Sequence, residues 1–196
     1  MLLFSEACER NKDPILQVLR GAFARSSQVL EIGSGTGQHA VHFAHHLPHL
    51  RWRPSDTAEH LDSLRARIVA EGTPNLALPV LLDVRAHPWP VSDADGVFSA
   101  NTLHIMSWEA VQEFFSGVGR VLKSGGVLSV YGPFRYAGRY TSESNAHFDV
   151  HLRERDPVSG IRDFEAVDAL ARKEGLELDS DHDMPANNRT LVWRRL

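Results

Sequence analysis

The sequence feature that most constrains the fold is a glycine-rich stretch at residues 29–37, VLEIGSGTG. An apolar run that stops at a glycine turn is typical of a buried strand, and the helical periodicity that follows predicts a strand, a tight loop and a helix. Glycines in such a loop let the backbone approach a ligand closely. We therefore expect an α/β protein that binds a nucleotide-like cofactor at this loop.

The spacing of the glycines separates two classes of cofactor. Dinucleotide-binding loops follow the pattern Gly-x-Gly-x-x-Gly, whereas the position of the third glycine is Gln38 in this chain. The pattern present is Glu-x-Gly-x-Gly-x-Gly, in which Glu31 stands two residues before Gly33. Because a carboxylate attracts a cation and repels a pyrophosphate, the spacing favours a cationic cofactor. A nicotinamide cofactor and a simple strand turn remain as alternatives.

This motif resembles that of class I S-adenosylmethionine-dependent methyltransferases. The resemblance implies that Glu31 meets the ammonium group of the methionine moiety. It also implies that the glycine loop packs beside the cofactor through Gly33, Ser34, Gly35 and Gly37. The cofactor expected from the resemblance is S-adenosylmethionine, with S-adenosylhomocysteine as its product.

Asp56 ends the second expected strand, residues 51–56, about 20 residues beyond the glycine loop. A carboxylate at that position can accept hydrogen bonds from two vicinal ribose hydroxyls. The alternative is that Asp56 caps the helix expected over residues 58–71, a role that Thr57 could fill equally well. Pro54 leaves the pairing of this strand open, because proline has no donor for a ladder hydrogen bond.

Two further strands, residues 77–82 and 95–100, also end beside polar residues. Asp83 and Val84 follow the first, and the resemblance implies an adenine site near them, although Asp83 could instead form a turn. Asn101 follows the second strand. Ligands of open α/β sheets sit outside the carboxyl ends of the strands, so we expect Asn101 to border the cofactor.

The first expected helix precedes the glycine loop. Asp13-Pro14 predicts its start, because Asp is a favoured N-cap and Pro a favoured first helical residue. Just ahead of this start, Arg10 and Asn11 either reach over the cofactor loop or pair with neighbouring acids.

The second expected helix, residues 38–47, carries an apolar stripe for the sheet and three histidines opposite it, His39, His42 and His46. Histidines three and four residues apart on a helix can bind a metal ion. No acid or cysteine is interleaved with these three, so we expect a solvated face and no metal site.

After the fourth strand, the pattern predicts a helix at residues 108–122, a Gly-Gly turn, a strand and a closing hairpin at residues 176–195. Residues 135–160 are polar and aromatic and form either a substrate lid or a surface loop, and their aromatic content favours the lid. Tyr136 and Asn145 in this segment are candidate substrate contacts.

The reaction expected for such a cofactor is an in-line displacement, in which a nucleophile attacks the methyl carbon of a sulfonium. The protein must chiefly align and desolvate the reactants. A base is needed only when the acceptor arrives protonated, and the candidates near the expected site are His104, His147, Asp149 and Tyr131.

Several short signatures along nearly the whole chain resemble one family of small class I methyltransferase-like proteins of unknown function. The resemblance implies that Arg10 and Asn11 contribute to cofactor binding, and that Asn187 and Asn188 face the substrate. The signatures are Ser5-x-Ala7-x-x-Arg10-Asn11-x-x-Pro14-Ile15, the glycine loop, Pro54-Ser55-Asp56, Tyr131-Gly132-Pro133-Phe134, Ser144-Asn145 and Met184-Pro185-Ala186-Asn187-Asn188.

The fold implied by the resemblance is an α/β Rossmann-like methyltransferase fold. It has a seven-stranded mixed sheet in the order 3-2-1-4-5-7-6, with strand 7 antiparallel and helices on both faces. The length of 196 residues suits one domain over residues 1–196 with such a sheet at its centre. The alternation of strands and helices predicts right-handed crossovers.

Composition narrows the expected partners. A net charge of -4 provides no basic field for a polyanion, so we expect a small-molecule acceptor rather than nucleic acid. The single cysteine, Cys8, suits a reducing compartment, and no apolar run approaches membrane-spanning length, so a cytoplasmic location is expected. The sequence leaves the oligomeric state open.

The function expected from these features is S-adenosylmethionine-dependent methyl transfer to a small-molecule acceptor. Fold alone does not exclude a protein that binds S-adenosylmethionine or S-adenosylhomocysteine without catalysis. A NAD(P)-dependent oxidoreductase is a less favoured alternative, because the glycine spacing departs from the dinucleotide pattern.

Overall fold

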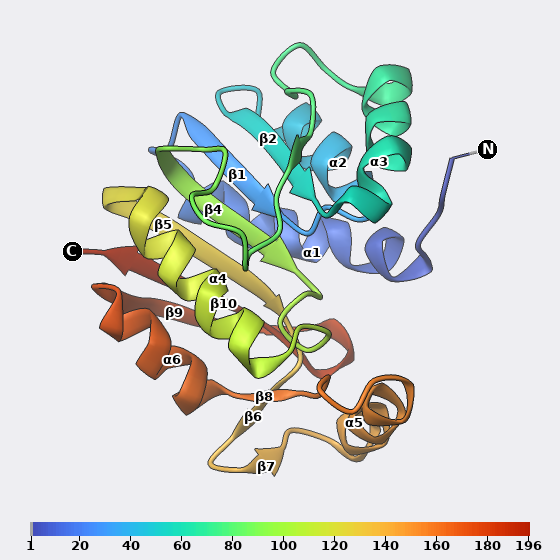
Figure 1. Ribbon diagram of the computed structural model, residues 1–196, viewed down its shortest axis with the longest axis vertical. Helices are drawn as coiled ribbons and strands as arrows, with labels where there is room; N and C mark the ends of the chain where they lie inside the picture. Colours follow the sequence, from blue (N-terminus) through green and yellow to red (C-terminus); the bar gives the residue numbers. More distant parts are fainter. Residues whose placement is uncertain (1) are drawn as a thin grey trace.

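A seven-stranded mixed sheet forms the centre of the computed structural model, which describes residues 2–196 (Figure 1). The strand order is β3-β2-β1-β4-β5-β10-β9. Since β9 and β10 are the sixth and seventh strands of this sheet along the chain, the expected order 3-2-1-4-5-7-6 is confirmed. The strands are β1 (Gln28–Ile32), β2 (Arg51–Asp56), β3 (Val80–Leu81), β4 (Ala94–Ala100), β5 (Leu122–Gly132), β9 (Leu176–Met184) and β10 (Asn188–Arg195).

The parallel and antiparallel pairings follow the expected pattern. Strand β1 pairs in parallel with β2 and β4, and β4 pairs in parallel with β5. Strand β10 runs antiparallel to both of its neighbours, β5 and β9. The carboxyl ends of β1, β2, β4 and β5 therefore meet at one edge of the sheet, where ligands of this architecture bind.

Helices cover both faces of the sheet and bury one hydrophobic core on each (Figure 1). Apolar side chains of α1, α2 and α3 fill one core, and those of α4 and α6 fill the other. The helices are α1 (Glu6–Ala22), α2 (Gln38–His46), α3 (Ala58–Glu71), α4 (Trp108–Val121), α5 (Glu143–Arg155) and α6 (Phe164–Lys173). No helix within residues 2–196 is long and apolar enough to cross a membrane.

Helix α1 begins earlier than expected, at Glu6 instead of near Asp13. Ser5 is the N-cap, and its hydroxyl oxygen accepts a hydrogen bond from the Cys8 N–H at 3.3 Å. Acidic residues in the first turn stabilise this start through the helix dipole. Pro14 therefore lies inside the helix, where it removes one backbone hydrogen bond, and the prediction of a start at Asp13-Pro14 was wrong.

The third strand is shorter than residues 77–82, because only Val80–Leu81 pairs with the end of β2. Trp52 and Asp56 of β2 bond to the backbone of residues 75, 77 and 82 on that side of the strand. Pro54 lies between these two positions and pairs with Glu31 of β1 on the other side. The missing N–H of Pro54 therefore falls where β3 makes no ladder hydrogen bond.

Residues 135–160 are folded, and most of them belong to a small second sheet and a helix. This sheet has the order β7-β6-β8, formed by β6 (Phe134–Tyr136), β7 (Arg139–Tyr140) and β8 (Arg162–Asp163), and α5 follows β7. Strands of two or three residues are too short to show a period, and the apolar residues of α5 do not gather on one face. The sequence pattern therefore predicted none of these elements, and the role of residues 135–160 as a substrate lid stays a prediction.

Candidate functional site

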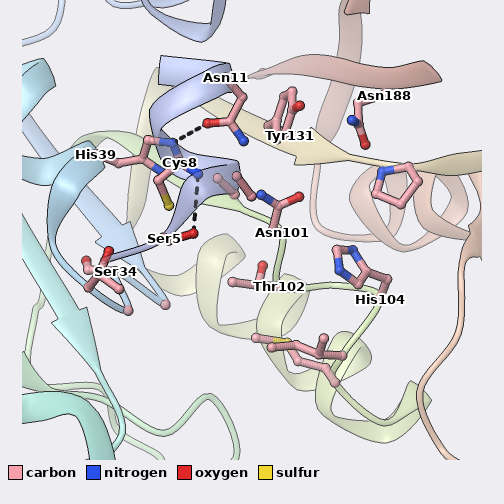
Figure 2. A pocket seen from close by; sticks show the side chains of 18 of the residues that line it. Ser5, Cys8, Asn11, Ser34, His39, Asn101, Thr102, His104, Tyr131 and Asn188 are labelled. Atoms are coloured by element: carbon pink, nitrogen blue, oxygen red, sulfur yellow. Dashed lines mark hydrogen bonds between the residues drawn. The ribbon is translucent and has the colours of Figure 1, made fainter. Parts of the chain in front are cut away.

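A cavity of about 1050 Å³ opens at the carboxyl ends of β1, β2, β4 and β5. Figure 2 shows Asn101, Thr102 and His104, which follow β4, below Asn11, Tyr131 and Asn188 in that view. The predicted residues that line the cavity are Arg10, Asn11, Gly33, Ser34, Gly35, Asp56, Asp83, Val84, Asn101, His104, Tyr131, Asn145 and Asn188. The predicted residues outside this lining are Glu31, Gly37, Tyr136, His147, Asp149 and Asn187.

The glycine loop is held tightly against the end of β2. The backbone N–H groups of Gly33 and Ser34 both donate to the Ser55 carbonyl at 3.0 Å. Gly33, Gly35 and Gly37 all have positive φ, at 74°, 53° and 76°. A Cβ at Gly33 would lie 2.4 Å from the Thr102 methyl carbon, so this position requires glycine for space as well as conformation.

Asp56 links the glycine loop to the start of α3. Its Oδ2 accepts from the Gly35 N–H at 2.6 Å, and its Oδ1 accepts from the Thr57 N–H at 2.8 Å. Thr57, not Asp56, is the N-cap residue of α3. A carboxylate offers about four lone-pair sites, so Asp56 retains acceptors that can face a hydroxylated ligand in the cavity.

Glu31 lies behind the glycine loop, with only 2% of the residue exposed. Its Oε2 accepts a hydrogen bond from the indole N–H of Trp52 at 2.8 Å. Burial raises the pKa of Glu31 to about 7, although hydrogen bonds from Trp52 and Ser34 oppose the rise. The carboxyl group therefore gains or loses a proton near neutral pH, and its predicted contact with an ammonium group stays a prediction.

The start of α1 is fixed over the glycine loop by Gln38. The Ser5 N–H donates to Gln38 Oε1 at 2.6 Å, and Gln38 Nε2 donates to the Ser5 carbonyl at 3.3 Å. These two hydrogen bonds between Gln38 and Ser5 hold the start of α1 where Ser5 and Cys8 line the cavity (Figure 2). Arg10 also lines the cavity, but its side chain is 72% exposed and lies 3.6 Å from Glu6. Arg10 can therefore either reach over the cofactor loop or pair with Glu6.

His39 is buried, so the expectation that all three histidines of α2 face solvent was wrong. Its Nε2 lies 2.6 Å from Asn11 Oδ1, and the residue is 5% exposed (Figure 2). Burial lowers the pKa of His39 to about 3, so the ring is neutral. The reason for the error is that α1 packs against α2 and covers this face. Within residues 2–196, no group of three His, Cys, Asp or Glu side chains is placed to hold a metal ion.

Tyr131, at the end of β5, is 3% exposed and faces the cavity. Burial raises the pKa of its hydroxyl, while hydrogen bonds with Asn11 and Asn188 work in the other direction. The net rise keeps the phenol protonated at neutral pH. Tyr131 is therefore suited to donate a hydrogen bond rather than to act as a base.

His104 lies on the loop after β4, where it is 7% exposed and lines the cavity. Its ring meets Phe148 of α5 edge to face, with the two ring centroids 5.5 Å apart. Burial lowers the pKa of His104 to about 4, and the positive charge of Arg162 adds to the fall. The ring is therefore neutral and can accept a hydrogen bond from a ligand.

Three of the predicted residues outside the cavity lining instead hold the segment around α5 in place. Asp149 accepts from the Tyr140 hydroxyl at 2.8 Å, from Arg153 Nε at 2.9 Å and from the Ile161 N–H at 2.5 Å. The Tyr136 hydroxyl donates to Asp181 at 2.8 Å, and the Asn187 carbonyl accepts from Asn145 Nδ2 at 2.9 Å. Of the four candidate bases, only His104 and Tyr131 line the cavity.

Replacing Asp149 tests this structural role. Burial disfavours its charged form, but hydrogen bonds from Arg153, Tyr140 and the Ile161 N–H outweigh burial and lower its pKa. Asp149→Ala should reduce the free energy of unfolding by about 2–4 kcal/mol, measured by urea denaturation, because several donors lose a buried partner.

Arg153→Met provides the matched control for Asp149→Ala. It removes only one half-exposed partner of the carboxylate, so it should cost less than about 1 kcal/mol. Equal losses in the two variants would contradict the role assigned to Asp149.

Comparison with known protein families matches residues 3–195 to the family described as "Protein of unknown function (DUF938)". This match covers almost the whole chain.

Comparison with solved structures finds the same fold at low sequence identity. An O-methyltransferase family protein from Burkholderia thailandensis has a TM-score of 0.84 and 20% identity, covering 97% of this chain and 57% of its own. PigF with SAH has a TM-score of 0.81 and 16% identity, and the match covers 95% of this chain and 56% of PigF. An O-methyltransferase family 2 protein from Planctomyces limnophilus in complex with apigenin has a TM-score of 0.77 and 15% identity. That match covers 94% of this chain and 62% of the other protein. The present chain thus spans less than two thirds of each of these proteins.

Proposed function

The chain belongs to the DUF938 family of proteins of unknown function, and we propose that it is an S-adenosylmethionine-dependent methyltransferase acting on a small-molecule acceptor. The observation that carries the proposal is the cavity itself. It joins residues 33–36 of the glycine loop to Asp56 and Asn101 at the carboxyl edge of a sheet whose order is that of class I methyltransferases. The fold likeness to O-methyltransferases, one of them with SAH, supports the same reading.

The residues of the cavity fit the proposed cofactor. The glycine loop leaves no room for a Cβ at Gly33, because this atom would lie 2.4 Å from the Thr102 methyl carbon. Asp56 would hold the ribose hydroxyls, and Asp83 and Val84 would border the adenine. The Asp83 carboxylate pairs with Arg85 at 2.7 Å, so it adds no unpaired charge there. Bound S-adenosylmethionine would supply a methyl group on a sulfonium sulfur, which leaves readily as the neutral thioether of S-adenosylhomocysteine.

His104 is the residue best placed to receive a proton from the acceptor. In the proposed displacement, the nucleophile forms a bond to the methyl carbon as the bond to sulfur breaks. A hydroxyl becomes far more acidic once it is alkylated, so a neutral imidazole takes its proton even though the pKa of His104 is about 4. Tyr131 would orient the acceptor and help to exclude water, and Asn11 and Asn101 would contribute to cofactor binding.

Replacing His104 by Phe keeps a ring against Phe148 but removes the proton acceptor. We expect kcat to fall by roughly 10²-fold or more, while the affinity for S-adenosylhomocysteine stays unchanged. His147→Phe is the comparison variant, because His147 is outside the cavity lining and should keep kcat within about twofold. Loss of activity in His147→Phe alone would reverse the assignment. Steady-state kinetics and calorimetry separate the two effects.

Transfer of a labelled methyl group tests the proposal against the alternative of a binding protein without catalysis. The purified protein is incubated with S-adenosylmethionine carrying a radioactive methyl group and a protein-free cell extract that retains the small molecules. The proposal predicts label in the small-molecule fraction, and less than one hundredth of it with Asp56→Ala. Binding of S-adenosylhomocysteine without any transfer of label would instead support the binding protein.

A further inference from the structure

The part of the cavity beyond Asn101 has a wall of uncharged polar groups. We call this part the acceptor half, and its polar lining includes Asn11, Thr102, His104, Tyr131, Asn145 and Asn188. All of these except Asn188 are buried, with exposures between 3% and 7%. The two that can ionise are kept neutral by burial, which lowers the pKa of His104 and raises that of Tyr131.

The charged side chains around the cavity are already paired or lie at its mouth. Asp56 accepts from two backbone N–H groups on the cofactor side, and Asp83 pairs with Arg85. Asp156 is exposed and accepts from the Val158 N–H at 3.2 Å. Arg10 lies near Glu6 in solvent. A charged group inside the acceptor half would therefore lose its hydration without gaining a counter-charge.

The positive charge of Arg162 acts on His104, and the guanidinium group of Arg162 is already hydrogen-bonded to backbone carbonyls. Its Nε donates to the Leu103 carbonyl at 3.0 Å, and its Nη2 donates to the carbonyls of Met106 and Val158. Arg162 is not part of the cavity lining. It fixes the loop that carries His104, and it leaves the acceptor half without a free positive charge on its wall.

Apolar side chains form the outer rim of the acceptor half. Ile105, Phe148 and Val158 line the cavity and remain 56%, 38% and 53% exposed. They come from the loop after β4, from α5 and from the segment after α5. An apolar molecule that covers these side chains would remove their surface from water at about 25 cal/mol per Å².

We propose that the acceptor half takes an uncharged small molecule, with an apolar body against Ile105, Phe148 and Val158 and an O–H or N–H group directed at His104. This inference rests on the proposed function, because it identifies the acceptor half by its position relative to the cofactor loop. It excludes carboxylate, phosphate and ammonium compounds as preferred acceptors, since each would bring an unpaired charge into a buried neutral wall.

Ligand-observed NMR on the protein loaded with S-adenosylhomocysteine tests the charge preference. The fragment library contains equal numbers of neutral, anionic and cationic compounds matched in size. The inference predicts that neutral fragments dominate the hits, and that Phe148→Lys weakens their binding. Dominance of charged fragments, or no hits at all, would overturn it. Failure of S-adenosylhomocysteine to bind, measured first by calorimetry, would instead count against the proposed function.

A charge-switch pair of variants on α5 sharpens the test. Phe148→Lys places an ammonium group at the rim, whereas Val150→Lys places one on the same helix outside the cavity lining. The probes are the tightest neutral hit and an analogue with a carboxylate in place of one neutral substituent. Phe148→Lys should shift the affinity ratio towards the carboxylate by at least about tenfold, and Val150→Lys should not. An equal shift in both variants, or none in either, would contradict the inference.

Discussion

Gly33→Ala should weaken binding of S-adenosylhomocysteine by tenfold or more and reduce the free energy of unfolding by roughly 2–4 kcal/mol. The residue has φ of 74°, which an alanine adopts only with strain. Its new Cβ would also lie 2.4 Å from the Thr102 methyl carbon, so the loop or the segment after β4 must move. Calorimetry and urea denaturation measure the two losses.

Two further variants separate strain from collision at Gly33. Gly125 also has a positive φ, of 76°, but a Cβ added there would meet nothing within 4 Å. Gly125→Ala should therefore lower the free energy of unfolding only by the backbone strain and leave the affinity for S-adenosylhomocysteine unchanged. Thr102→Ser removes the colliding methyl group and keeps the hydroxyl that lies 2.6 Å from the Ser99 hydroxyl. Combined with Gly33→Ala, it should restore much of the lost affinity. No rescue would contradict the steric account.

Glu31→Gln should stabilise the folded protein above pH 7 and weaken the binding of S-adenosylhomocysteine. Burial raises the pKa of Glu31 from its usual 4.5 to about 7. Between these values the folded protein holds a proton that the unfolded chain has lost, so this group makes stability fall as pH rises. The full effect is on the order of 3 kcal/mol. Glutamine cannot ionise and still accepts from the Trp52 indole.

The measurement is urea denaturation of both proteins between pH 5 and 8. The difference between them should be small near pH 5, grow up to about pH 7 and level off above that pH, where Glu31 is ionised in both the folded and the unfolded state. His39 and His104, whose depressed pKa values give the opposite slope, cancel in this difference. Glu31→Ala is the control, because it leaves the Trp52 N–H without its partner and should cost about 1–3 kcal/mol. A flat difference for Glu31→Gln would contradict the account.

The local pattern predicted the parts of the site that belong to single strand–loop units. The glycine loop and Asn101 directly follow strands, and Asp56 is the last residue of β2, so the rule for open α/β sheets places them at one edge. Other contacts of the site join α1 or its N-cap to α2. They are the hydrogen bonds between Ser5 and Gln38 and between Asn11 and His39. Whether such side chains meet depends on how α1 packs. Because α1 begins at Glu6 instead of near Asp13, residues 6–12 are helical, which the sequence pattern did not predict.

The region around α5 was the least predictable for a related reason. Its strands β6, β7 and β8 have two or three residues each, and α5 carries no apolar stripe. What holds the region together is a set of polar contacts centred on Asp149. Such contacts leave no periodic signal in the sequence, so Asp149 resembled a candidate base although it does not line the cavity.

Calorimetric titration with S-adenosylhomocysteine and with NAD tests the central claim most directly. We expect saturable binding of one S-adenosylhomocysteine per chain, weakened tenfold or more by Gly33→Ala, and no binding heat with NAD under the same conditions. Binding of NAD in the absence of any binding of S-adenosylhomocysteine would contradict the claim that this cavity holds a methyl donor.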